Sequence, residues 1–190
     1  MNTRGSEAEP VEPARETSVE RCRVGLERDV FLRTLLRHLA GTLEDVVGTE
    51  EAAGFISVVG QQMGEDIGDA YRMGLGVERL SREQVAEVLV DLKRRIKGEF
   101  SVVDQDDERI LMVNRACPFG DKVLGRPTLC MMTSNVFGSI ASRELGYAKV
   151  ELQQTIARGD GQCTVLVHLK STKEAKAAPG REYYRGAEYE

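Results

Sequence analysis

Three cysteines in the second half of the chain are the residues whose type and spacing suggest chemistry. Cys117 and Cys130 have twelve residues between them, and Cys163 follows a Gly-Asp-Gly turn. Cysteine thiolates bind soft metal ions and react with oxidants, so cysteines that meet in a fold can form a metal, cluster or redox site. A free cysteine is also among the most buried residue types and then acts as a small apolar residue. The spacing is less specific than paired C-x-x-C motifs and leaves both interpretations open.

Cys130 falls near the first turn of a predicted helix, where unpaired backbone N–H groups stabilise a thiolate and lower the pKa of the thiol. We therefore expect Cys130 to be a metal ligand or a redox-reactive thiol. A closed zinc site needs a fourth ligand, and Glu151 is the best candidate because it precedes the last predicted hairpin. Glu144 and His168 are weaker candidates. Alternation along the last strand places His168 on the face opposite to Cys163.

Support for an enzyme is thin. The sequence has no C-x-x-C pair, no Ser/His/Asp or Cys/His arrangement and no phosphate-binding loop in the required context. Three hypotheses are therefore weighed. The chain is a sensor that binds a small ligand or metal, a thiol-based redox switch, or a structural dimerisation module whose cysteines belong to the core.

The composition is that of a folded globular protein. The chain has 190 residues, of which 41% are hydrophobic and 30% charged, as expected for one domain. A net charge of −5 argues against a nucleic-acid partner, because such binding depends on clustered Lys and Arg. No apolar run approaches the roughly 20 residues that span a bilayer. We expect a cytoplasmic protein whose four cysteines are reduced or bind metal.

Both ends of the chain have the composition of tails. Residues 1–24 are acidic, contain two prolines and few large apolar residues, and are predicted to be disordered. Cys22 falls in this tail and is expected to take no part in the site. Residues 25–170 are predicted to form the regulatory domain. Residues 171–190 are rich in Lys, Glu, Ala and Gly and are predicted to be a flexible tail.

Three helices are predicted in the first half of the domain. Apolar residues at helical spacing predict the first over residues 25–47, and these residues are Leu32, Leu35, Leu36, Leu39, Leu43 and Val46. The second covers residues 49–75, with Gly60, Gly64 and Gly68 on one face. Such a stripe indicates close packing of two helices, or a groove for a ligand or a partner helix. A capping box at Ser81 begins the third.

The second half alternates between hairpins and a helix. Residues 100–104 and 109–114 read as one hairpin, and residues 149–157 and 163–169 as another. A helix over residues 128–145 lies between them, with Thr128 as its predicted N-cap. The order is three helices, a hairpin, a helix and a hairpin. The fold class is therefore α+β, with helices packed on an antiparallel sheet.

Several short motifs occur in an order that resembles a known superfamily. They are Cys117-Pro118-Phe119-Gly120, Pro127-Thr128-Leu129-Cys130, Glu151, and Gly159-Asp160-Gly161-Gln162-Cys163 before an apolar strand. The chain resembles the vinyl-reductase-like (V4R-like) sensor superfamily over about residues 30–170, and in particular the methanogen output domain. The resemblance implies a sandwich related to trafficking-complex proteins, no enzymatic activity, a small-ligand pocket and dimerisation through the helices.

The resemblance also suggests site residues and cofactors. Related phenol-sensing regulators hold zinc with three cysteines and a glutamate, which implies a metal site of Cys117, Cys130, Cys163 and Glu151. The cysteine pair is also similar to part of the cluster-binding region of iron–sulfur repressors. For a small ligand, the expected binding residues are Cys117, Phe119, Cys130, Gly64 and Gly68. A homodimer that signals to a regulatory partner protein, without direct nucleic-acid or membrane binding, is the expected assembly.

Overall fold

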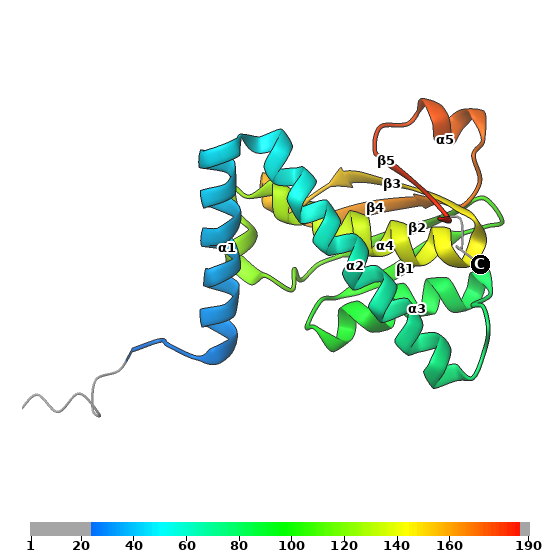
Figure 1. Ribbon diagram of the computed structural model, residues 1–190, viewed down its shortest axis with the longest axis horizontal. Coiled ribbons are helices and arrows are strands. Elements are labelled where there is room, and N and C mark those ends of the chain that lie inside the picture. The colour runs from blue at the N-terminus through cyan, green and yellow to red at the C-terminus, as the bar shows by residue number, and fades with distance from the viewer. Residues whose placement is uncertain (1–23, 187–190) are drawn as a thin grey trace, which may run out of the picture.

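A five-stranded antiparallel sheet forms the centre of the fold, in a computed structural model that describes residues 24–186 (Figure 1). The spatial order of the strands is β1-β2-β4-β3-β5. The predicted hairpins are confirmed, since β1 pairs with β2 and β3 with β4. The strands are β1 (Phe100–Gln105), β2 (Arg109–Asn114), β3 (Tyr147–Gln154), β4 (Cys163–His168) and β5 (Arg181–Tyr184).

Helices cover one face of this sheet, as the α+β prediction requires. Alternate strand residues, among them Ile110, Met112, Val165 and Val167, point toward the helices and are buried with Phe137 in the main core. Figure 1 shows α2 crossing in front of α4, with the sheet behind. The helices are α1 (Arg28–Val47), α2 (Thr49–Leu75), α3 (Arg82–Arg95), α4 (Cys130–Leu145) and the short α5 (Lys173–Ala177). None of these described helices is long and apolar enough to cross a membrane.

The helix ends follow the sequence signals closely in one case and depart from them in another. The capping box at Ser81 forms as predicted, with Ser81 Oγ accepting from the backbone N–H of Gln84. The start of α4 differs, because the short 3-10 helix Pro127–Leu129 leads directly into Cys130. Thr128 does not cap the helix. Its hydroxyl instead donates to the Glu44 carboxylate on α1.

The C-terminal segment differs from the predicted flexible tail. Residues 173–177 form α5, and β5 pairs with β3, so that Ala148 and Tyr183 are register partners. The Tyr183 ring packs directly on Gly138 of α4, and its hydroxyl lies 3.0 Å from Ser134 Oγ. A four-residue strand among charged residues gives no periodic signal, which explains the failure of the prediction. The predicted N-terminal tail and Cys22 lie outside the described residues, apart from Val24.

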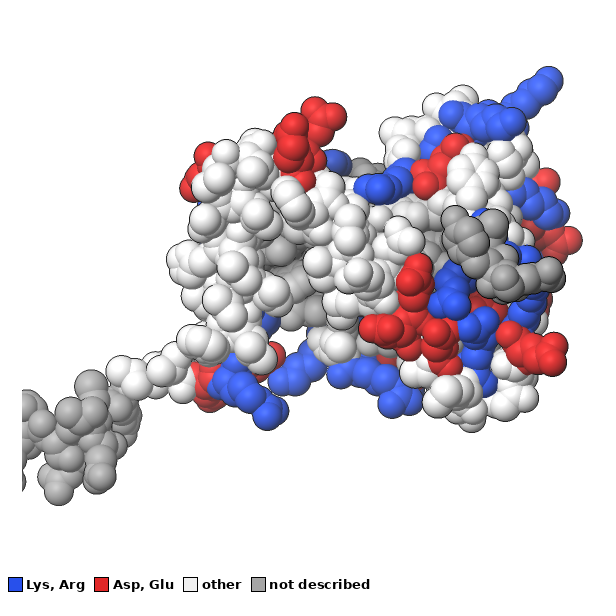
Figure 2. Space-filling view, viewed as in Figure 1, with Lys and Arg blue, Asp and Glu red and all other residues white. Residues whose placement is uncertain are grey.

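The apolar stripe of α1 does not enter the core. Phe31, Leu32, Leu35, Leu36 and Leu39 are each more than two-fifths exposed, while the buried residues of α1 are Ala40 and Gly41. Phe55, Val58, Val59 and Met63 of α2 are also exposed. Figure 2 shows largely uncharged surface over α1 and the first part of α2. We call these nine exposed residues the α1–α2 apolar face.

Candidate functional site

The three cysteines line one small cavity at an end of the sheet. Cys117 comes from the loop after β2, Cys130 is the first residue of α4, and Cys163 is the first residue of β4. The cavity has a volume of about 30 Å³, which holds one or two water-sized groups. Its other walls are mostly apolar and include Phe100, Pro118, Phe119, Val123, Leu129, Leu152 and Val165.

Strand pairing and two turns bring the cysteines together. Asn114 at the end of β2 is the register partner of Cys163, so the chain leaves β2 beside Cys163 and reaches Cys117 three residues later. The Cys117 carbonyl then accepts from Gly120 N at 2.8 Å. The Cys163 thiol accepts from Ile156 N at 3.4 Å, which ties the loop after β3 to the cavity. Three cysteines that are far apart in the sequence therefore line the same cavity.

Two of the thiols at this cavity, those of Cys117 and Cys130, are not activated. Burial raises the pKa of Cys117 above its ordinary value, and burial raises the pKa of Cys130 to about 12. The expectation of a lowered pKa at Cys130 was therefore wrong. The physical reason is that the cost of burying a thiolate among apolar walls outweighs the stabilisation from the helix N-terminus.

Lys93 is a functional candidate that the sequence analysis missed. It is only 4% exposed, and its Nζ donates to Thr133 Oγ1, a cavity-lining residue, at 2.8 Å. The ammonium lies 5.7 Å from the centre of the Phe100 ring and 5.2 Å from that of Phe137. Burial lowers the pKa of Lys93 to about 8, partly offset by the nearby cysteines. The sequence signal for its burial was its position four residues after Leu89, which places both residues on the same face of the helix.

The structure does not bring Glu151 to the cysteines. Val150 and Leu152 point into the main core with Cys163, so Glu151 lies on the other face of the sheet. Its Oε2 is 3.7 Å from His168 Nε2, which is on that same face as predicted. Across residues 24–186, no three Cys, His, Asp or Glu side chains are grouped so as to hold a metal ion. The residues present therefore do not fit the zinc or iron–sulfur site that the resemblance implies.

The glycine stripe does not form part of this cavity. Gly60 and Gly64 of α2 face α4, where a β-carbon on Gly60 would lie 2.8 Å from Asn135 Cβ. The interpretation as close helix packing explains both glycines. Gly64 and Gly68, which were expected to bind a ligand, are absent from the walls of the cavity, whereas Cys117, Phe119 and Cys130 lie in them.

Polar side chains attach α1 to the loop that carries Cys117. Arg37 Nη1 donates to the carbonyls of Lys122 and Leu124, both at 2.7 Å. Arg33 donates to the carbonyl of Phe119 at 3.5 Å. Further along α1, Glu44 pairs with Arg126 at 3.2 Å and accepts from Thr128. These contacts connect α1 with the cavity wall directly.

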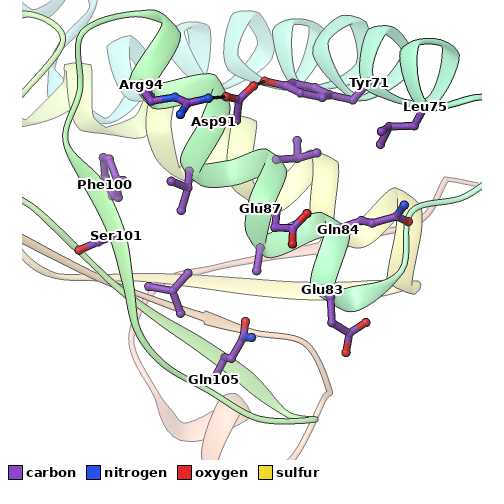
Figure 3. Close-up of a pocket in the computed structure, with 14 residues that line it drawn as sticks. Tyr71, Leu75, Glu83, Gln84, Glu87, Asp91, Arg94, Phe100, Ser101 and Gln105 are labelled. Atoms are coloured by element: carbon purple, nitrogen blue, oxygen red, sulfur yellow. Dashed lines mark hydrogen bonds and ion pairs between the residues drawn. The ribbon is translucent and has the colours of Figure 1, made fainter.

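A larger depression lies on the other side of α3, between α2 and β1, with a volume of about 760 Å³ (Figure 3). Two of its three carboxylates are already paired with arginines. Asp91 accepts from Tyr71 at 2.6 Å and also pairs with Arg94. Glu83 pairs with Arg82 at 2.6 Å. This depression is wide and two of its three carboxylates are already paired, so the cysteine-lined cavity is the better candidate site.

Comparisons with known proteins agree with the fold. A phenol-responsive sensory domain of the transcription activator PoxR, solved with phenol, superposes with a TM-score of 0.58 at 16% identity, over 82% of this chain and 81% of that chain. A trafficking protein particle complex subunit 3 from Naegleria fowleri, covalently bound to palmitic acid, gives a TM-score of 0.57 at 16% identity. The superposition covers 82% of this chain and 99% of that chain. No curated protein matches the sequence.

A family profile matches the part of the chain that builds the site. The profile described as Methanogen output domain 1 covers residues 35–168, which include most of α1, the four strands β1 to β4 and all three cavity cysteines. This match confirms the resemblance inferred from the sequence motifs, and with the fold of the two solved structures it agrees with a V4R-like sensor domain. The chain belongs to the methanogen output domain 1 family.

Proposed function

We propose that this chain is a non-enzymatic sensor domain that binds a small ligand in the cysteine-lined cavity and signals through α1. The observation that carries this proposal is the connection between cavity and helix. Phe119 supplies its side chain to the cavity wall and its backbone carbonyl to Arg33 of α1. A ligand that displaces this loop must also displace the hydrogen-bond partners of α1, so occupancy of the cavity changes the position of the helix.

The family and one solved relative support a sensory role. Membership of an output-domain family fits a chain that passes a signal to another molecule. The sensory domain that superposes on this chain responds to phenol, so this fold accommodates small-molecule sensing. The raised pKa values of Cys117 and Cys130 weigh against the alternative of a thiol redox switch, because the thiolate is the reactive form.

We propose further that the α1–α2 apolar face binds a second copy of the chain. Exposed apolar residues gathered on two neighbouring helices, such as Phe31, Leu35 and Phe55, are typical of protein–protein contact surfaces. A homodimer through this face would place α1, the helix that contacts the cavity loop, at the interface. Ligand binding would then alter the dimer, and the dimer would present the signal to a partner protein.

The coupling is tested without knowledge of the ligand. Cys130→Met fills the cavity and mimics occupancy, and Val167→Met overpacks the core away from the cavity as the matched control. Hydrogen–deuterium exchange of residues 28–47 is measured in both variants and in the wild type. We expect altered exchange in Cys130→Met alone. Equal exchange in the two variants, at equal loss of stability, would refute a link between cavity and α1.

The dimer is tested by placing a charge on the apolar face. Leu35→Glu is expected to give a monomer by light scattering after size-exclusion chromatography, because an unpaired carboxylate is costly to bury. Val103→Glu is the control, since Val103 is an exposed apolar residue of the edge strand β1. A wild-type chain that is monomeric at micromolar concentration, or a Leu35→Glu variant that still dimerises, would exclude this interface.

A further inference from the structure

The cavity carries hydrogen-bond donors that have no acceptor. Asn114 is fully buried, and its Oδ1 accepts from the backbone N–H of Glu99 at 2.9 Å and of Ala116 at 3.3 Å. These two bonds fix the orientation of the amide, because the NH₂ end cannot accept. Asn114 Nδ2 has no hydrogen-bond partner and belongs to the cavity wall. Leaving such a donor unpaired costs about 1–3 kcal/mol.

Thr155 supplies a second unpaired group in the wall of the same cavity. Its backbone is held in place, since Thr155 N donates to Asp160 Oδ2 at 2.7 Å and its carbonyl accepts from Arg158 N at 3.0 Å. The Thr155 hydroxyl is buried, has no nitrogen or oxygen partner and lies beside the Cys130 thiol. Both residues are therefore fixed by other bonds and present a free polar group to the same small space.

Lys93 adds a buried positive charge behind the same wall. Its neighbours are the hydroxyl of Thr133, two aromatic rings and the three cysteines, with no carboxylate among them. Buried charges in proteins are normally paired. The Cys117 and Cys130 thiols do not supply the counter-charge, because burial raises the pKa of each and keeps both neutral.

We propose that the cavity binds a small oxyanion, such as a short carboxylate, with the Lys93 ammonium as counter-charge and Asn114 Nδ2 and the Thr155 hydroxyl as hydrogen-bond donors. This inference rests on the proposed sensor function and names the chemical class of its ligand. Two amide hydrogens, a hydroxyl and an ammonium match the lone pairs of a carboxylate or similar group. The volume of about 30 Å³ selects anions with few heavy atoms.

The test uses sodium formate as the probe of the full chain. Thermal unfolding is followed against formate concentration at pH 7, with sodium chloride holding the ionic strength constant and neutral formamide as the isosteric comparison. We expect formate to raise the melting temperature in a saturable manner, and chloride and formamide to have no such effect. A melting temperature that formate raises no more than chloride or formamide would overturn the proposal.

Three variants assign the effect to the cavity. Lys93→Met should weaken formate binding at least about tenfold, because it removes the positive counter-charge, and Asn114→Asp should abolish binding by placing a negative charge in the wall. Lys170→Met, at an exposed lysine, should bind formate as the wild type does. A Lys93→Met variant that keeps the wild-type affinity would also overturn the proposal. The exchange experiment on α1 needs no ligand, so its outcome tests the sensor function separately.

Discussion

Gly64 of α2 and Ser139 of α4 approach so closely that a β-carbon on Gly64 would lie 2.7 Å from Ser139 Cβ. At Gly68, one turn later, the same β-carbon would meet only Ile140 Cγ1 at 3.8 Å, an ordinary contact. The two glycines therefore give opposite predictions. Gly64→Ala should destabilise the fold by about 1–3 kcal/mol through overpacking, whereas Gly68→Ala should stabilise it by up to about 1 kcal/mol through helix propensity.

Urea denaturation of the two variants checks these two predictions directly, since each variant is the control for the other. Both replacements have the same gain in helix propensity, so the difference in unfolding free energy isolates the contact with Ser139. If Gly64→Ala were as stable as Gly68→Ala, the close packing of α2 on α4 would be wrong.

The C-terminal strand is expected to be part of the cooperative fold. Tyr183→Ala should cost about 3–5 kcal/mol, as for other buried aromatic residues, because its ring packs on Gly138 of α4. Tyr183→Phe should cost about 1 kcal/mol through loss of the hydrogen bond to Ser134. Tyr184 is 62% exposed, so Tyr184→Ala serves as the control. Equal stability of the two alanine variants would mean that β5 is not anchored in the core.

The fold could be predicted to a large extent because its signals are local. The capping box at Ser81, the turn at residues 105–108 and the Gly-Asp-Gly turn each determine the backbone over a few residues. A hairpin pairs two strands that are consecutive in the sequence, so the order of the predicted strands was enough to predict which ones pair. The prediction failed for β5, which pairs with β3 although β4 and α5 lie between them in the sequence. The helix α1 formed where it was predicted, but its apolar spacing could not show which partner it faces.

The candidate site was predicted less well because its properties depend on burial. The places of Cys117, Cys130 and Cys163 at element boundaries allowed convergence without determining it, and the three residues line one cavity in the structure. The helix N-terminus predicted a reactive Cys130, but the apolar walls, which come from distant segments, raise the pKa of the thiol instead. The burial of Lys93 likewise results from its contact with Phe137 on another helix.

The cavity thiols are expected to be unreactive at neutral pH. The pKa of Cys130 is raised to about 12 and that of Cys117 is raised by burial, so little thiolate is present at pH 7.5. In a Cys22→Ser background, alkylation by iodoacetamide at Cys117 and Cys130 should be slower than that of free cysteine by about tenfold or more. Mass spectrometry of the labelled peptides measures each rate. Alkylation of Cys130 as fast as free cysteine would revive the redox hypothesis.

The buried ammonium of Lys93 gives a prediction for the pH dependence of stability. Burial lowers the pKa of Lys93 from its ordinary 10.5 to about 8 in the folded protein. The folded state therefore binds the proton less tightly than the unfolded state. Below about pH 8 this difference reduces the free energy of unfolding by its full amount. The penalty is removed as pH rises from 8 toward 10.5. Its full size is about 3 kcal/mol.

Comparison with Lys93→Met isolates this contribution. Above about pH 9 the raised pKa values of Cys117 and Cys130 act in the opposite direction, but they are common to both proteins. In anion-poor buffer, Lys93→Met should be more stable than the wild type at pH 7, by up to about 3 kcal/mol, and the difference should shrink as pH rises above 8. Urea denaturation from pH 6.5 to 9.5 gives the two curves, with Lys170→Met expected to follow the wild type. A difference independent of pH would show that Lys93 is not a buried cation, and the cavity would then lack the charge that an oxyanion requires.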